Sequence, residues 1–160
     1  MTTSIHAGSC FCGAVSYTVT GKPTLSAYCH CTRCQVPAHF TASATGSALI
    51  WTIHYPTAAF AWTQSEPHDA HLDSYVTGGK PWKTRYRCKT CGSCVASHNT
   101  KVGSWSVWGT QFERDENGET KDLEGVRPTA HIFYDTAIVN VDDGLGKWDG
   151  YEGKSTRLGN

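Results

Sequence analysis

The sequence carries no excess of charge of either sign. Its 160 residues contain 14 Lys or Arg and 14 Asp or Glu, so the formal net charge at pH 7 is zero. No global field would therefore draw the chain to nucleic acid or to an anionic membrane. The nearest approach to a basic cluster, Lys83, Arg85, Arg87 and Lys89, alternates along an expected strand and is typical of a solvated strand face. We expect neither nucleic acid nor a membrane among the partners.

Long apolar runs are also missing. No segment approaches the ~20 apolar residues of a membrane-spanning helix. Residues 1–9 lack the basic and apolar parts of a secretory signal. We therefore expect a cytoplasmic protein, in which the eight cysteines stay reduced rather than forming disulfides. A chain of this length buries about 70% of its unfolded surface, so we expect one domain over residues 1–160 without disulfide support.

Helical periodicity is nearly absent. The sequence instead has short runs rich in Val, Ile, Thr, Trp and Tyr, separated by Gly and Pro, which favour a mainly β fold. The strands are predicted at residues 14–19, 48–55, 83–88, 105–112, 131–134 and 137–141, with one short helix at 32–36. Long loops are predicted over 63–79 and 115–128, and an irregular C-terminal tail over 142–160.

Cysteine is the residue that the chain groups most tightly. Two pairs, a triplet and a single cysteine follow one another in the order Cys10 and Cys12; Cys29, Cys31 and Cys34; Cys88 and Cys91; Cys94. Thiolates one to three residues apart can converge on one tetrahedral zinc ion at about 2.3 Å each. The two pairs together would make a closed four-thiolate site, which is typical of structural zinc. Gly13 and Gly92 directly follow the pairs, as a chelating turn with positive φ requires.

The triplet provides three ligands and leaves one position of a second zinc ion open. That position can take water, a substrate thiol or another side chain, and thiolate-bound zinc favours a sulfur-containing substrate. Alternatively, a further side chain closes the site and makes it structural. The candidates for that role are His30, His39, His98 and Cys94.

A few other residues are candidates for catalysis or substrate binding at the open site. His30, His39 and His98 are weak candidates for acid–base catalysis. The sequence favours a packing or hydrogen-bonding role for His30 and an ordinary polar role for His39 and His98. Arg33, next to two ligands, could attract the carboxylate of a substrate. Trp105 and Trp108 lie three positions apart on a predicted strand, so their side chains point to opposite faces and at most one of them can line the substrate site.

Three segments, residues 8–17, 28–34 and 86–93, resemble the glutathione-dependent formaldehyde-activating enzyme (GFA) family, which includes the centromere protein V type. The motifs share their order, spacing and flanking glycines with that family, and the resemblance spans about residues 8–134.

The resemblance implies an Mss4-like fold of coiled β-sheets stapled by zinc. It implies structural zinc at Cys10, Cys12, Cys88 and Cys91, and a second, open zinc at Cys29, Cys31 and Cys34. The family's named activity joins formaldehyde to glutathione, giving S-(hydroxymethyl)glutathione. A zinc-dependent carbon–sulfur lyase with two Zn²⁺ per chain and glutathione as a co-substrate is therefore the leading hypothesis.

Residues 35–40 depart from the family pattern, and the loop at 63–79 is longer than the family's usual connection. These departures leave two alternatives open. One is a zinc enzyme for addition or elimination on a larger secondary metabolite or its thiol conjugate. The other is a non-catalytic zinc module that binds a protein partner, because one fold can carry several functions.

Overall fold

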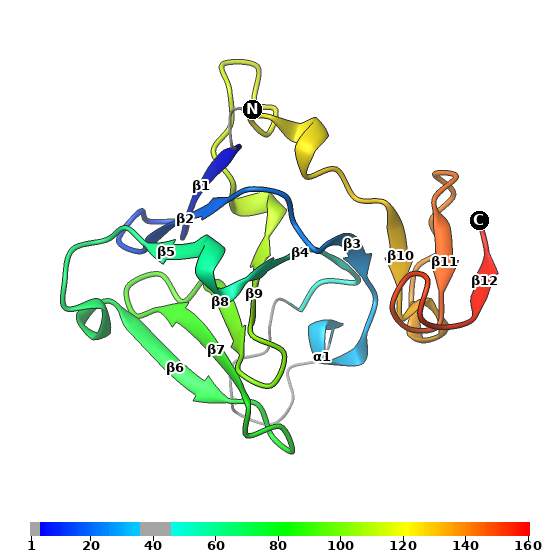
Figure 1. Ribbon diagram of the computed structural model, residues 1–160, viewed down its shortest axis with the longest axis horizontal. Coiled ribbons are helices and arrows are strands. Elements are labelled where there is room, and N and C mark those ends of the chain that lie inside the picture. The colour runs from blue at the N-terminus through cyan, green and yellow to red at the C-terminus, as the bar shows by residue number, and fades with distance from the viewer. Residues whose placement is uncertain (1–3, 36–45) are drawn as a thin grey trace. The chain divides into compact units, whose positions relative to one another are not determined.

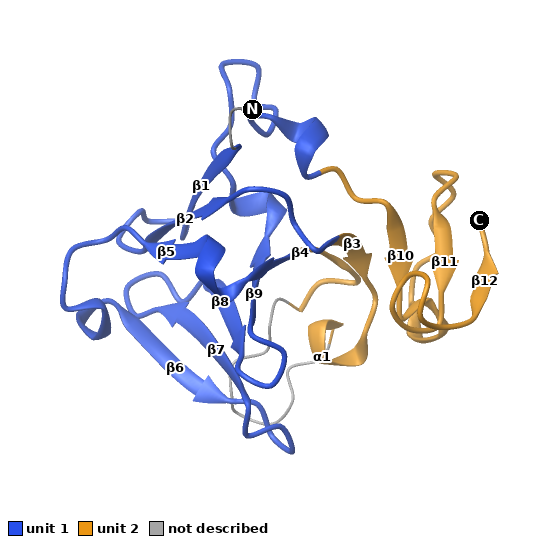
Figure 2. Ribbon diagram, viewed as in Figure 1, with its two compact units in different colours: residues 1–25, 53–126 blue, residues 26–52, 127–160 orange. Residues whose placement is uncertain are grey.

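The computed structural model describes residues 4–35 and 46–160 of the chain (Figure 1). These residues form short β-strands, one α-helix of a single turn and several 3₁₀ turns, so the prediction of a mainly β fold is confirmed. The chain divides into two compact units, which are residues 1–25 with 53–126 and residues 26–52 with 127–160 (Figure 2). The expectation of one domain over residues 1–160 stays a prediction.

A three-stranded antiparallel sheet in the first unit carries the N-terminal hairpin. Its strands, in the order β1-β2-β5, are β1 (Ile5–Ser9), β2 (Ser16–Thr20) and β5 (Phe60–Trp62). In β2, Tyr17 and Val19 alternate with more accessible polar residues and are fully buried. This period of two directs one face of the hairpin to the core.

An antiparallel run of four strands makes up most of the remaining β structure of the first unit. It consists of β6 (Leu72–Val76), β7 (Lys83–Cys88), β8 (Cys94–Asn99) and β9 (Ser104–Trp108), each paired with the next. The aromatic rings of Phe60 and Trp105 stack with centroids 4.1 Å apart, and Tyr17 stacks on Phe60 at 5.4 Å. Stacked aromatic rings therefore provide much of the first unit's core.

The second unit is built around a short strand with parallel partners on both sides. β10 (Ala130–Ile132) runs parallel to β3 (Leu25–Cys29) and to β11 (Gly146–Trp148), and β12 (Arg157–Gly159) is antiparallel to β11. All three residues of β10 are buried, as expected for a strand with a partner on each side. The helix α1 (Thr32–Gln35) follows β3 directly.

The remaining elements connect these strands. β4 (Ile50–Pro56) begins in the second unit and ends in the first. The 3₁₀ turns are η1 (Thr57–Ala59), η2 (His68–Ala70), η3 (Gly109–Gln111), η4 (Leu123–Gly125) and η5 (Tyr134–Thr136). No helix among the described residues is long and apolar enough to cross a membrane.

The predicted strand at 137–141 is wrong. Phe133 adopts φ 54°, which turns the chain out of β10 and into η5. The Tyr134 hydroxyl then donates to Asn140 Oδ1 at 2.8 Å and accepts the N–H of Val141 at 2.9 Å. These local hydrogen bonds replace the strand ladder that the apolar residues of this segment indicated.

Four further expectations need correction. The tail over 142–160 is not irregular, because β11 and β12 lie in it. The segment 63–79 is not one long loop, since η2 and β6 lie in it and β6 pairs with β7. Arg85 is buried rather than on a solvated strand face. The predicted strand at 105–112 ends at Trp108, where η3 begins.

Candidate metal centres

Four cysteine sulfurs from two distant turns meet in the first unit. Cys10 and Cys12 lie in the turn between β1 and β2, while Cys88 ends β7 and Cys91 lies in the turn before β8. The four sulfurs all lie within 4.8 Å of one another. The distances from the Cys12 sulfur are 3.6 Å to Cys10 and 3.7 Å to Cys88. A tetrahedral zinc–thiolate site has edges of about 3.8 Å, so the cluster has the size of a metal site.

Local backbone geometry explains why each pair converges. Gly13 and Gly92 have φ of 79° and 73°, the left-handed conformation that the sequence predicts for these positions. Their N–H groups donate to the carbonyls of Cys10 and Cys88 at 3.1 and 2.9 Å and close the two turns. The N–H of Val15 also donates to the Cys10 sulfur at 3.3 Å. The two turns thus direct their sulfurs toward one another, and a backbone N–H group in the first turn binds one of these sulfurs.

The second cluster combines the end of β3 with α1. The sulfurs of Cys29, Cys31 and Cys34 lie within 4.8 Å of one another, with Cys31 3.2 Å and Cys29 3.8 Å from the sulfur of Cys34. Across residues 4–35 and 46–160, no fourth histidine, cysteine or carboxylate joins this group. The cluster therefore provides three ligand atoms from the described chain.

Without a cation, the three thiols of this cluster do not all ionise. Hydrogen bonds with the other two sulfurs raise the pKa of Cys29, whereas such bonds lower the pKa of Cys31 to about 2. The charge of one thiolate therefore opposes ionisation of the other two sulfurs. A bound divalent cation would compensate all three thiolates, so that metal binding would release protons. Both donor sets consist of soft thiolates and fit a thiophilic metal ion.

The loop that carries the triplet is held by the backbone of its central residue. The N–H of His30 donates to the carbonyl of Ile132 at 3.0 Å. Its carbonyl accepts from the Gln35 side-chain amide at 2.6 Å and from the Thr136 hydroxyl at 3.0 Å. Residues from α1, β10 and η5 thus fix the position of the loop.

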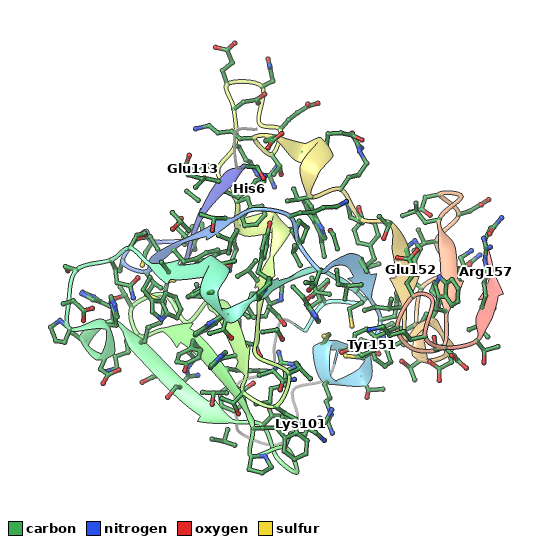
Figure 3. The ribbon with its side chains drawn as sticks, viewed as in Figure 1. His6, Lys101, Glu113, Tyr151, Glu152 and Arg157 are labelled. Atoms are coloured by element: carbon green, nitrogen blue, oxygen red, sulfur yellow. The ribbon has the colours of Figure 1, made fainter. Side chains whose placement is uncertain are left out.

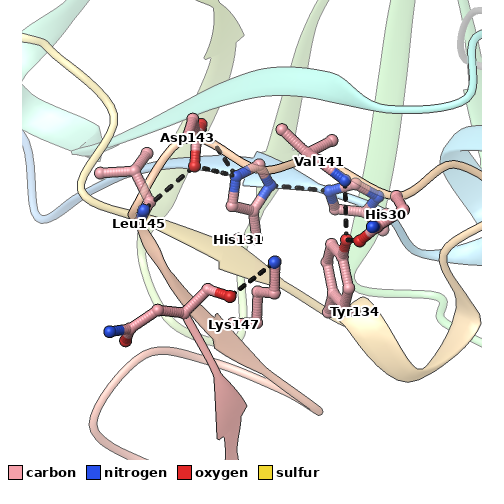
Figure 4. Close-up of polar contacts among 9 residues, drawn as sticks. His30, His131, Tyr134, Val141, Asp143, Leu145 and Lys147 are labelled. Carbon is pink, nitrogen blue, oxygen red and sulfur yellow. Dashed lines mark hydrogen bonds and ion pairs between the residues drawn. The ribbon is translucent and has the colours of Figure 1, made fainter.

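The side chain of His30 is buried and is not part of the metal cluster. Its Nε2 atom lies 2.9 Å from Nδ1 of His131, and the two rings are fully buried (Figure 4). Burial, with a contribution from His131, lowers the pKa of His30 to about 4. The imidazole therefore packs inside the second unit, which favours the interpretation of His30 as a hydrogen-bonding residue.

The other candidates from the sequence lie apart from the three-cysteine cluster or outside the described residues. His98 and Cys94 belong to the first unit, and neither joins a metal cluster of the described chain. His98 stacks on Trp105 at 4.5 Å and contacts the Thr57 hydroxyl at 3.3 Å. His39 lies outside the described residues.

The two tryptophans and Arg33 differ in exposure. Trp105 and Trp108 are both buried in the first unit, with 8% and 6% of their surface exposed, as expected of packing residues. Arg33 is exposed on α1, next to Cys34 in the sequence. Their assignment to substrate binding stays a prediction.

Three residues near the second cluster escape sequence analysis. His131 and Asp143 form the support of His30, and Tyr151 lies beside α1 in Figure 3. Burial, and then the charges of the Cys29, Cys31 and Cys34 sulfurs, raise the pKa of Tyr151. Its side chain remains 44% exposed. No local motif marks these residues, because they reach the cluster only through the pairing of β10 with β3 and β11.

The chain is similar to a known protein family and to solved structures. The family model described as glutathione-dependent formaldehyde-activating enzyme matches residues 5–136. None of the curated proteins matches the chain. Among solved structures, a crystal structure of a Rhodobacter sphaeroides protein is 18% identical and covers 71% of this chain and 96% of its own, with a TM-score of 0.44.

Proposed function

We propose, from the premise that the chain belongs to the glutathione-dependent formaldehyde-activating enzyme family, that it is a zinc-dependent carbon–sulfur lyase acting on a thiol adduct. S-(hydroxymethyl)glutathione is the adduct that the family description favours. The observation that carries the proposal is the three-cysteine cluster, which has no fourth protein ligand among the described residues. Three protein ligands leave a position for an external group, whereas four close a zinc site.

The four-cysteine cluster is assigned to structural zinc. Cys10, Cys12, Cys88 and Cys91 would hold one ion and tie the turn after β1 to the turn after β7. Such an ion contributes on the order of 10 kcal/mol to the folded state. Because four sulfurs complete the tetrahedral coordination of this zinc ion, no coordination position is left for a substrate.

The three-cysteine cluster is assigned to a second zinc ion at the reaction site. Zinc bound there would supply Lewis-acid chemistry and would lower the pKa of a bound thiol or water. In the direction of synthesis, the thiol sulfur forms a bond to the carbonyl carbon of formaldehyde, and the thiol proton ends on the aldehyde oxygen. The reverse reaction breaks that carbon–sulfur bond and returns both components.

The chain's own residues would bind and orient the adduct. The exposed guanidinium of Arg33 is assigned to a carboxylate of the glutathione part, since such a pair is charge-assisted. The partly exposed Tyr151 is assigned as a hydroxyl donor to the oxygen of the adduct. The partners implied are a small thiol-containing molecule and zinc, in the reducing conditions of the cytoplasm.

The test is the rate of adduct formation from glutathione and formaldehyde, followed by NMR with the zinc-loaded protein. We expect the wild type to accelerate the reaction over buffer and Cys31→Ala to abolish that acceleration. Cys94→Ala is the matched control, because Cys94 is a cysteine outside both clusters; it should retain the activity. A wild-type rate equal to that of buffer would contradict the proposal. Turnover of a larger thiol conjugate alone would favour the secondary-metabolite alternative.

A further inference from the structure

A chain of hydrogen bonds runs from Asp143 to the middle of the three-cysteine loop. Both carboxylate oxygens of Asp143 lie 3.1 Å from Nε2 of His131. Nδ1 of His131 lies 2.9 Å from Nε2 of His30 (Figure 4). The two imidazoles are 0% exposed, whereas the side chain of Asp143 is 34% exposed. All three residues belong to the second unit.

The carboxylate determines the direction of every bond in this chain. Ionised Asp143 can only accept, so Nε2 of His131 must carry the proton that it donates. In a pair of neutral rings, the Nδ1 atom of His131 is then the remaining acceptor. His131 Nδ1 then accepts, and Nε2 of His30 must donate to it. The Nδ1 atom of His30 is left as a lone pair, and it has no hydrogen-bond partner in the described part of the chain.

Neighbouring groups fix the position and the ionisation of the Asp143 carboxylate. The backbone N–H of Leu145 donates to its Oδ1 at 3.0 Å. Burial tends to raise the pKa of Asp143, but the Leu145 N–H and the His131 side chain outweigh that effect and lower it. The carboxylate therefore stays ionised at neutral pH, as an acceptor must.

His30 is the residue on which these bonds and the metal ligands converge. It lies between Cys29 and Cys31, and its N–H and carbonyl are bound to Ile132, Gln35 and Thr136. The bond from its side chain to His131 adds a further restraint, which fixes the ring and the backbone that carries it. Rotation of this residue would move the two sulfurs that flank it.

We propose that Asp143 is a positioning residue of the three-cysteine site, which acts by fixing the tautomers of His131 and His30 and thereby the loop that presents the three sulfurs. The inference rests on the metal site in the proposed function, but not on the reaction assigned to it. The family match ends at residue 136, so Asp143 lies beyond the part of the chain that the match covers. Side chains that hydrogen-bond the ligands of a metal typically change metal affinity by about 10- to 100-fold when removed, and Asp143 acts on the ligand loop through two histidines.

The first test reads the tautomers directly in the wild-type zinc protein. Long-range ¹H–¹⁵N correlation spectra should show both His30 and His131 neutral, protonated at Nε2 and bare at Nδ1. Asp143→Ala should remove the single tautomer of His131. Protonation of Nδ1 on either ring in the wild type would overturn the proposal without any variant.

The second test measures zinc affinity at both sites of the same chain by competition with a chromophoric chelator. Asp143→Ala should weaken zinc at the three-cysteine site by about 10-fold and leave the four-cysteine site unchanged. Asp142→Ala is the matched control, because Asp142 is exposed next to Asp143 and outside the chain of bonds. Equal affinities in the two variants, or equal weakening at both metal sites in Asp143→Ala, would overturn the proposal. Neither result depends on catalysis, so failure of the proposed reaction is a separate outcome.

Discussion

The sulfurs of Cys12 and Cys88 lie 3.7 Å apart, although 76 positions separate these residues in the sequence. Their contact joins the turn after β1 to the end of β7 within the first unit. In the apo protein such a contact has no covalent bond to hold it. A shared metal ion would close a long loop of chain, which is the arrangement that constrains the unfolded state most.

Replacement of Cys88 tests that role in stability. Cys88→Ser should abolish the part of the unfolding free energy that zinc at the four-cysteine site supplies, which is on the order of 10 kcal/mol. The measurement is thermal or urea unfolding with zinc and after chelation. Cys94→Ser makes the same chemical change outside the cluster and should keep the full difference between the zinc-loaded and chelated protein. A zinc-dependent stability in Cys88→Ser as large as that of Cys94→Ser would contradict the assignment.

Replacement of Arg33 tests the assigned contact with substrate carboxylate. Arg33→Gln should raise KM for glutathione about 3- to 10-fold, because one exposed charge-assisted pair is lost. The value of kcat should change little. Lys154→Gln removes an exposed positive charge elsewhere in the second unit and should leave KM as it is. Steady-state kinetics with glutathione at saturating formaldehyde measure both constants, and a KM unchanged in Arg33→Gln would remove this residue from the substrate site.

Gln35 supports the three-cysteine loop through its side-chain amide. The Nε2 atom donates to the carbonyls of His30 at 2.6 Å and Thr136 at 3.0 Å. Gln35→Glu would place a carboxylate against these oxygens and should weaken zinc at the three-cysteine site by about 1–3 kcal/mol. Gln111→Glu is the matched control, since Gln111 donates in the same way to the Cys94 carbonyl in the first unit. Zinc competition should show the effect in Gln35→Glu alone; equal affinities in both variants would contradict it.

His54 makes stability depend on pH. Burial, and then the charge of Lys83, lower the pKa of His54 from 6.5 to about 4. Between these values the unfolded chain binds a proton that the folded protein does not, so stability falls as the pH is lowered through this window. The slope from this group approaches about 1.4 kcal/mol per pH unit. Urea unfolding at pH 7, 6 and 5 should show a shallower fall for His54→Gln. Thiolate protonation affects both proteins alike, so parallel curves would show that this ring does not titrate as stated.

Gly8 allows the close approach of Tyr17 in the N-terminal hairpin. A Cβ atom at Gly8 would overlap the ring of Tyr17, which is fully buried and cannot move aside. We expect Gly8→Ala to destabilise the protein by about 1–3 kcal/mol, the usual cost of overpacking. Gly78→Ala adds the same methyl group in open space and should change stability little. Chemical unfolding of the two variants checks the difference, and equal stabilities would contradict this reading of the Gly8–Tyr17 contact.

Much of the metal chemistry could be predicted from local spacing. Two cysteines a few residues apart, followed by glycine, bring their sulfurs together through the turn itself, so Cys10 with Cys12 and Cys88 with Cys91 needed no tertiary information. The same holds for the helix beside the triplet. The strand predicted at 83–88 matches β7 at both ends, because the turns that bound it lie in the local sequence.

Expectations failed where the hydrogen-bond partners of a segment lie outside that segment. The apolar residues at 137–141 are typical of a strand, yet Tyr134 binds Asn140 and Val141 and leaves the segment without a ladder. The strands β11 and β12 went unpredicted because three residues carry no periodicity of their own. They form because β11 pairs in parallel with β10 and β12 pairs with β11.

The sequence by itself determined the family, the mainly β class and the division of seven cysteines into two pairs and a triplet, because spacing within a turn decides which neighbouring sulfurs can meet. The tertiary structure brings the two pairs together across 76 positions. Only the tertiary structure showed that His30 contacts His131, which in turn contacts Asp143, and that the His30 ring is not part of the cysteine cluster. The pairing of β10 with β3 joins residues that are more than a hundred positions apart. Contacts of that kind follow from the packing of the whole second unit and leave no local trace in the chain.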